Sequence, residues 1–206
     1  MSNVFVSVGM SLDGFIAGPN GGPTNPLGDR GPAIHEWIYQ QRAFRAAQHM
    51  GEGGETGQDN RILEATLARS GANIMGKRMF REGEANWPAE APFHTPVFVL
   101  TKEARAPWER PGGTTFYFVN DPIDAVLRRA RDAAGAKDVR IAGGAHVIAQ
   151  YLNAGLVDEL DISLAPVVIG GGVRLFDRVD RDKLGALKIV EAISSPAVTH
   201  LRYSVR

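Results

Sequence analysis

The apolar positions of this chain form short runs that are typical of buried β-strands. The runs are rich in β-branched residues and are bounded by glycine, proline or charged residues, which favours strands over helices. They predict strands at residues 4–10, 72–75, 96–100, 115–119 and 139–142. From residue 157 the pattern changes to alternation of apolar and polar positions, and further strands are predicted around residues 160–164, at 189–193 and at 198–205.

Helical spacing of apolar residues predicts helices between most of these strands. The best-marked helix has Asp121 as its N-cap, Pro122 at its first helical position and Gly135 at its end. Further helices are predicted at residues 34–50, 62–68 and 146–153. Alternating strands and helices favour parallel pairing, whereas the consecutive C-terminal strands favour antiparallel pairing. The order predicts one α/β domain over residues 1–206, with a mixed, mostly parallel central sheet and helices on both faces.

Glycine-rich segments interrupt this pattern. Residues 18–31 and 51–57 flank the first predicted helix, where a flexible lid over a cleft could form. Gly170-Gly171-Gly172 follows an apolar run and is interpreted as a bulge or a connection to the edge strands. Leu175 and Phe176, just after it, are predicted to lie in the core.

The composition narrows the possible partners. Lys and Arg together number 23, as do Asp and Glu, and this balance argues against nucleic acid or an anionic membrane as a partner. The chain has no cysteine, which excludes disulfides and thiol nucleophiles. No signal peptide and no membrane-spanning apolar run is recognised, so a cytoplasmic protein is expected.

Gly143-Gly144 is the most informative short motif. It stands between a predicted strand and a predicted helix, at a junction without side-chain bulk. The first amides of a helix and the positive end of its dipole converge there, so a phosphate group can approach the backbone closely. The motif alone is equally compatible with a tight turn that binds nothing, because it is not the full dinucleotide-binding fingerprint.

Cations and a hydroxyl follow two other predicted strands, in Gly76-Lys77-Arg78 and Leu100-Thr101-Lys102. Each segment alone is more simply interpreted as an exposed polar turn. Together with the diglycine motif they offer phosphate-binding groups at three strand ends, where sheet ligands tend to bind. The cations favour the 2′-phosphate of NADPH over NADH.

Few residues are candidates for proton transfer. Asp59 precedes the helix at residues 62–68, a position where an aspartate is usually an N-cap. Asp13 lies in an Asp-Gly turn, and Ile16 and Ala17 after it could form a flat wall for a nicotinamide ring. The histidines are widely spaced, so no metal site is predicted.

Several short motifs follow one another in order along nearly the whole chain. They are Ser11-Leu12-Asp13-Gly14-Phe15-Ile16-Ala17, Ile74-Met75-Gly76-Lys77-Arg78, Val99-Leu100-Thr101, Ile141-Ala142-Gly143-Gly144-Ala145 with Tyr151-Leu152, Leu156-Val157-Asp158-Glu159-Leu160, Pro166, the triple glycine at residues 170–172 and Arg174-Leu175-Phe176. In this order they resemble the dihydrofolate reductase fold family. The resemblance is closest to the reductase domain of bacterial riboflavin biosynthesis and its stand-alone relatives.

The resemblance implies that NADPH is the hydride donor. Ile16 and Ala17 would then contact the nicotinamide end of the cofactor. The remaining cofactor residues would be Gly76, Lys77 and Arg78 at the 2′-phosphate and pyrophosphate, Leu100, Thr101 and Lys102 around the adenosine, and Ile141, Gly143, Gly144, Ala145, His146 and Val147 along the strand end and helix that hold the pyrophosphate.

The resemblance also implies where the substrate binds. Dihydrofolate reductases place one carboxylate on the helix before the Met-Gly motif, and here Asn60 falls closest to that position, with Asp59 beside it. Asp59, facing Ser163, is the first candidate for the proton donor, and Asp13 is the second.

The expected function is an NADPH-dependent reductase that transfers a hydride to a small heterocycle of the pterin or aminopyrimidine type. Alternatives are a non-catalytic nucleotide-binding or interaction protein on a reductase-like scaffold, and an enzyme that uses flavin. Apolar residues exposed on the C-terminal strands would favour a homodimer.

Overall fold

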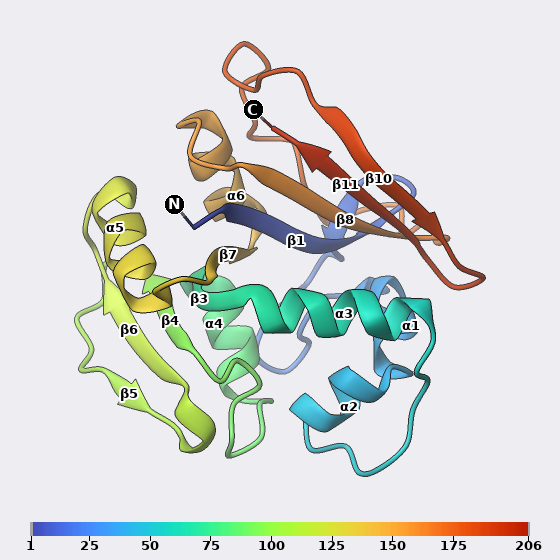
Figure 1. Cartoon of the computed structure of the whole chain (residues 1–206), viewed down its shortest axis with the longest axis horizontal. Coiled ribbons are helices and arrows are strands. Elements are labelled where there is room, and N and C mark those ends of the chain that lie inside the picture. Colours follow the sequence, from blue (N-terminus) through green and yellow to red (C-terminus); the bar gives the residue numbers. More distant parts are fainter. Residues whose placement is uncertain (1, 206) are drawn as a thin grey trace.

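A nine-stranded mixed sheet runs through the molecule in the order β10-β11-β8-β1-β7-β3-β4-β6-β5 (Figure 1). The structure is a computed structural model and describes residues 2–205. The strands of this sheet are β1 (Val4–Ser11), β3 (Ser70–Gly76), β4 (Pro96–Leu100), β5 (Trp108–Glu109), β6 (Thr115–Val119), β7 (Asp138–Gly143), β8 (Glu159–Ala165), β10 (Lys188–Ser194) and β11 (Thr199–Ser204). A separate two-stranded sheet pairs β2 (Phe15–Ala17) with β9 (Val173–Arg174).

The pairing confirms the predicted mixed sheet. Strand β1 pairs in parallel with β7 and β8, and β3 pairs in parallel with β7 and β4. At the C-terminus, β11 is antiparallel to β8, and β10 is antiparallel to β11. The short strands β2, β5 and β9 were not predicted from the sequence, because two or three residues are too few to establish an alternating pattern.

Helices cover both faces of the sheet, as predicted. Helices α5 (Ile123–Ala134) and α6 (Ala145–Asn153) pack on one face, where the largest cluster of buried apolar side chains lies. Helices α3 (Gln58–Arg69) and α4 (Lys77–Glu84) lie on the other face. Arg69 fixes the end of α3 to this face, because its guanidinium lies 3.8 Å from the Phe5 ring centroid and bonds Asp138 and Glu159.

The helix predicted over residues 34–50 is broken into three short pieces. They are the 3₁₀ helix η1 (Gly31–His35), α1 (Glu36–Tyr39) and α2 (Arg42–Ala47). The break lies at Gln41, which is extended and buried. Glu55 donates its backbone N–H to Gln40 and accepts from Arg42, so the glycine-rich segment 51–57 interrupts the helix by pairing with it.

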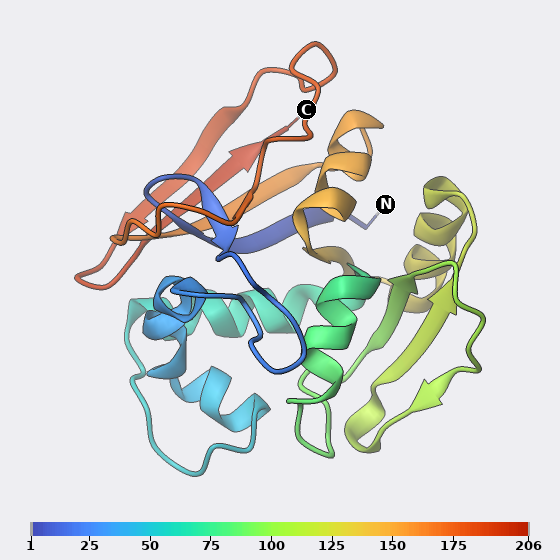
Figure 2. The same ribbon diagram turned by 180° about the vertical axis from the view of Figure 1, so that it is seen from behind.

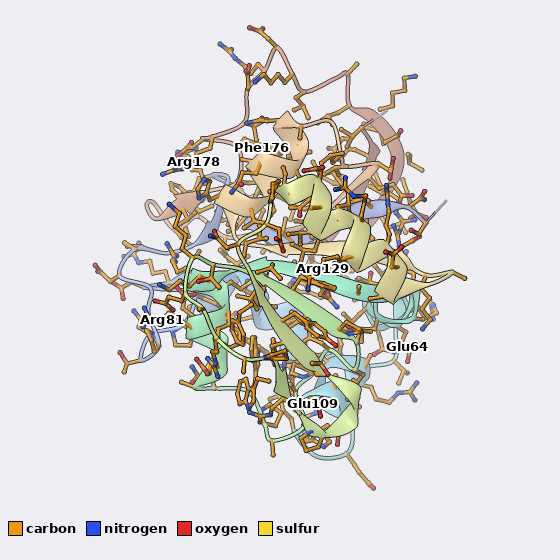
Figure 3. All side chains as sticks on the ribbon, turned by 90° about the vertical axis from the view of Figure 1, so that its left-hand side faces the viewer. Glu64, Arg81, Glu109, Arg129, Phe176 and Arg178 are labelled. Atoms are coloured by element: carbon orange, nitrogen blue, oxygen red, sulfur yellow. The ribbon has the colours of Figure 1, made fainter. Side chains whose placement is uncertain are left out.

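Three other local predictions were wrong. The helix placed at residues 62–68 begins at Gln58 and has Gly57, not Asp59, as its N-cap. Asp121 makes no side-chain capping bond to α5 and instead accepts a hydrogen bond from Arg129, two turns into the helix. Leu175 is buried as predicted, but Phe176 is 37 % exposed on the segment after β9 (Figure 3).

The segment 18–31 lies beside α4 as a closed loop (Figure 2). The Gly18 N–H donates to the Leu27 carbonyl, and Asp29 accepts from the side chains of Asn20 and Asn25. These hydrogen bonds tie the two ends of the loop together, so it forms a defined wall beside the sheet.

Strand β10 forms one edge of the sheet and carries exposed apolar side chains. Ile189 and Val190 are 69 % and 59 % exposed. The expected apolar surface on the C-terminal strands is therefore present, and the homodimer stays a prediction. Among residues 2–205, no helix combines the length and apolar character needed to span a membrane.

Candidate active site

A cleft of about 1220 Å³ opens where the parallel strands β3, β4 and β7 end. Its walls also include α3 and the loop 18–31. Most predicted site residues line it, namely Ile16, Ala17, Gly76, Lys77, Arg78, Leu100, Thr101, Lys102, Gly143, Gly144, Ala145, His146, Val147 and Ser163. Four predicted site residues, Asp13, Asp59, Asn60 and Ile141, are not among the lining residues.

The diglycine motif forms the junction between β7 and α6. The peptide bond between Gly143 and Gly144 is cis, and Gly143 has a φ of 127°, which L side chains rarely adopt. A Cβ added to Gly144 would meet nothing within 4 Å, so its backbone is open to the cleft. Because no described side chain caps α6, its first amides are available to an anionic ligand.

Gly76 allows the end of β3 to approach this junction. A Cβ at Gly76 would lie 3.0 Å from Val147 Cγ2, tighter than ordinary contact. The three strand ends therefore converge on one cleft, and the group they form fits a dinucleotide with its phosphates at α6.

Two of the three predicted phosphate-binding cations already have carboxylate partners. Lys77 donates a hydrogen bond to Glu103, which lowers the pKa of Glu103. Arg78 pairs with Glu82 at 2.9 Å between Nε and Oε1. Lys102 lines the same part of the cleft and is exposed. A phosphate would therefore compete with Glu103 and Glu82 for two of the three cations.

At the other end of the cleft, three side chains from distant elements form a hydrogen-bonded chain. Ser163 on β8 and His200 on β11 are register partners, with 3.1 Å between Ser163 Oγ and His200 Nδ1. His200 Nε2 lies 3.1 Å from Asp59 Oδ1 on α3. Ser163 and His200 line the cleft, whereas Asp59 stands behind them and is 7 % exposed.

Neighbouring groups fix the orientation of this chain. Ser195 Oγ donates to Asp59 Oδ2 at 2.8 Å, so both carboxylate oxygens of Asp59 are engaged. The Trp37 ring meets the His200 ring edge-on, with 5.0 Å between centroids. From the sequence, Asp59 was expected to face Ser163; in the structure the His200 ring lies between these two side chains.

Asn60 and Asp13 are engaged elsewhere. Asn60 Oδ1 accepts from the Ala43 backbone N–H, which ties α3 to α2. Asp13 accepts hydrogen bonds from Ser11 Oγ and from the backbone N–H groups of Ile169 and Gly170. These bonds, chiefly that from Ser11, lower the pKa of Asp13. The arrangement favours a structural role for Asp13, in which it holds the turn after β1 against the segment before the triple glycine.

The floor of the cleft beside His200 is polar and charged. Burial lowers the pKa of Arg140 to about 10 and raises the pKa of Asp161, although the pairing of Asp161 with Arg202 opposes the second effect. His35 lies over Gly9, where an added Cβ would come within 2.9 Å of its ring. Burial lowers the pKa of His35 to about 4, so it is neutral near pH 7.

Sequence reasoning missed His200. The residue stands in the alternating segment before the C-terminus, where a histidine among apolar positions indicates nothing specific. A polar side chain on the inward face of a predicted strand was the one available signal, and it gave no partner. The contact with Asp59 joins positions 141 residues apart, so it exists only in the folded chain.

The strand order and cleft define a dihydrofolate reductase-like fold. A dihydrofolate reductase from Enterococcus faecalis, solved with NADP(H), superposes with a TM-score of 0.55 and 11 % identity over 98 % of this chain and 95 % of that chain. Residues 2–200 match the RibD C-terminal domain, and the chain belongs to this family.

Two further structures are similar over 100 % of this chain. One is a protein from Shewanella sp. PV-4 assigned to riboflavin biosynthesis, with a TM-score of 0.64, 21 % identity and 99 % of that chain covered. The other is the Thermotoga maritima diaminohydroxyphosphoribosylaminopyrimidine deaminase/5-amino-6-(5-phosphoribosylamino)uracil reductase, with a TM-score of 0.63, 14 % identity and 57 % covered. At these identities the likeness establishes the fold.

Two curated proteins of Bacillus subtilis (strain 168) match parts of the sequence. The uncharacterised protein YyaP is 42 % identical over 59 residues, which cover 29 % of this chain and 31 % of YyaP. The uncharacterised protein YwjB is 31 % identical over 71 residues, which cover 34 % of this chain and 40 % of YwjB. The matched stretches span less than half the length of these relatives.

Proposed function

We propose that this protein is an NADPH-dependent reductase of a small heterocyclic substrate, of the pterin or aminopyrimidine type. The observation that carries the proposal is the convergence of three strand ends, at Gly76, Leu100 and Gly143, on one cleft whose far end holds the Asp59–His200–Ser163 chain. One end fits a dinucleotide, and the other offers groups that move protons. Membership of the RibD C-terminal domain family supports the same reaction class.

The cofactor would lie along the strand ends. The uncapped amides of α6 would bind its pyrophosphate, and Lys77, Arg78 and Lys102 would face its 2′-phosphate. Ile16 and Ala17, on β2, would form the wall beside the nicotinamide. When bound, NADPH supplies the hydride, while the protein orients the reactants and excludes water.

The substrate would occupy the part of the cleft between α3 and the polar face of the sheet. Ile62 and Leu63 provide an apolar wall there, and Ser163 faces it from β8. We assign Asp59 to the proton-transfer end, where it supports protonation of the reduced substrate through its contact with His200. In this proposal Asp13 takes no part in the reaction.

Titration and turnover assays test the proposal. Calorimetric titration with NADPH and NADH should show binding with a preference for NADPH. Loss of nicotinamide absorbance should then follow addition of dihydrofolate or of 5-amino-6-(5-phosphoribosylamino)uracil. Binding without oxidation of NADPH by either probe would favour a non-catalytic nucleotide-binding protein, and no binding of NADPH would refute both functions.

A further inference from the structure

His200 lies between Asp59 and Ser163, the two side chains that were expected from the sequence to face each other. Its ring nitrogens are both engaged, Nδ1 with Ser163 Oγ and Nε2 with Asp59 Oδ1, each at 3.1 Å. The residue is 8 % exposed and lines the cleft. A histidine held in this way has its two nitrogens in distinct roles, because the group bound to one nitrogen determines where the proton lies on the other.

We propose that His200 is the proton source for the reduced substrate, that Ser163 passes the proton on, and that Asp59 is a positioning residue. The proposal rests on the reductase function above and identifies the acid in it. Asp59, with Ser195 bound to its second oxygen, keeps a proton on His200 Nε2. The proton on Nδ1 of the imidazolium then points at Ser163 Oγ and is the one that leaves.

The step balances in protons and electrons. A bound nicotinamide cofactor would supply the hydride to the carbon of a C=N or C=O bond, and the nitrogen or oxygen of that bond would take the proton of the Ser163 hydroxyl. As the Ser163 hydroxyl gives its proton to the substrate, Ser163 Oγ takes a proton from His200 Nδ1. His200 is left neutral, still donating Nε2–H to Asp59, and recovers its proton from water.

The surroundings suit this role. Trp37 packs edge-on against the ring and shields it from the side of α1 (Glu36–Tyr39). The charged or titratable groups that face this region are Asp59 from α3, Asp161 from β8, Arg202 from β11, Glu191 from β10, Arg140 from β7 and His35 from η1. Arg202 is paired with Asp161 and Glu191, and the Asp59 carboxylate is bonded directly to the His200 ring.

The decisive variants are His200→Gln and Ser163→Ala, assayed with dihydrofolate and with 5-amino-6-(5-phosphoribosylamino)uracil. His200→Gln preserves hydrogen bonds to Ser163 and Asp59 but has no proton to transfer. We expect kcat to fall by about 100-fold, the size of general acid catalysis, with KM changed by less than about twofold. Ser163→Ala should lower kcat similarly, and Ser163→Thr, which keeps the hydroxyl, should restore most of it.

Two further readouts distinguish transfer from structure. In His200→Ala, added imidazole should restore part of kcat, which a purely structural histidine would not permit. In the ligand-free protein labelled with ¹⁵N-histidine, a hydrogen-bonded ring N–H resonance of His200 should be present, absent in His200→Gln and shifted in Ser163→Ala. His49→Gln, at an exposed site paired with Glu90 outside the cleft, is the matched control.

Unchanged kcat in His200→Gln would overturn the proposal and leave the reductase function standing. So would a loss of kcat that imidazole does not restore and that comes with an equal rise in KM. If wild-type protein binds NADPH but turns over neither probe, the reductase function itself fails and the proton-transfer role falls with it, even where the His200 resonance is present.

Discussion

The proposed cofactor end and the proposed proton-transfer end of the cleft are built in different ways. At the proposed cofactor end, the lining groups come from short contiguous segments, each at the end of a parallel strand, and they include Gly76, Gly143 and Gly144. At the other end, the groups are single side chains from α3, β8 and β11 that meet only through tertiary contacts.

This difference separates two requirements. Binding phosphates requires amides and small residues, which a strand–turn–helix junction provides wherever it occurs. Proton transfer requires particular atoms at hydrogen-bond distance, which only a fixed arrangement of distant elements provides. We therefore expect substitutions at the first end to act on binding and those at the second to act on turnover.

The largest effect is expected for Gly144→Leu. The added side chain would project into open space in the cleft, so the fold should persist while the path of the pyrophosphate is blocked. NADPH affinity should fall by about 100-fold or more, roughly 3 kcal/mol, in calorimetric titration. Gly57→Leu is the matched control, because its Cβ position is also open but lies outside the cleft. Unchanged affinity in Gly144→Leu would show that the cofactor lies elsewhere.

A smaller effect is expected for the basic strand ends. Lys102→Ala should weaken NADPH by about tenfold and leave NADH affinity unchanged, because it removes one charge-assisted contact to the 2′-phosphate. Lys77→Ala should have less effect, since Glu103 already offsets the Lys77 charge. Lys183→Ala, at an exposed position outside the cleft, serves as the control. Equal losses for NADPH and NADH would contradict the assignment.

Asp13 and Asp59 offer a direct contrast between a structural carboxylate and one at the site. Asp13→Ala should lower the Tm by a few degrees and leave kcat unchanged, because it frees the amides of Ile169 and Gly170 from the turn. Asp59→Asn should act mainly on kcat and only weakly on the Tm, because it weakens the hydrogen bond that positions the His200 ring. Thermal melts and initial rates measure both, and a loss of kcat in Asp13→Ala would restore it as a catalytic candidate.

The last prediction concerns the pH dependence of stability through His35. Its pKa in the folded protein is lowered from 6.5 to about 4, so between these values the unfolded chain binds more protons than the folded one. Stability should therefore fall as the pH falls from about 6.5 to about 4. His35→Gln should flatten that part of the curve in urea titrations at a series of pH values. An unaltered slope would show that His35 is not buried as a neutral ring.

The fold was predictable because its strands and helices leave local patterns. Strands β4 and β6 begin and end where the apolar runs do, and α6 starts within one residue of its predicted position. The prediction of one helix over residues 34–50 was wrong because the backbones of Gln40 and Arg42 pair with that of Glu55, a contact that no local pattern encodes. The prediction that Phe176 is buried was wrong because an apolar residue next to a core position does not itself have to be buried.

By itself, the sequence determined the alternation of strands and helices, the diglycine junction and the two basic strand ends. Each of these depends on neighbours within a few residues, through backbone conformation, amide direction and hydrophobic period. Only the tertiary structure decided that Asp59 reaches Ser163 through His200 and that Asn60 turns toward α2. The side chains of adjacent helical residues point about 100° apart, so the orientation of α3 against the sheet decides which of them faces the site. Arg69 and the pairing of β8 with β11 determine that orientation.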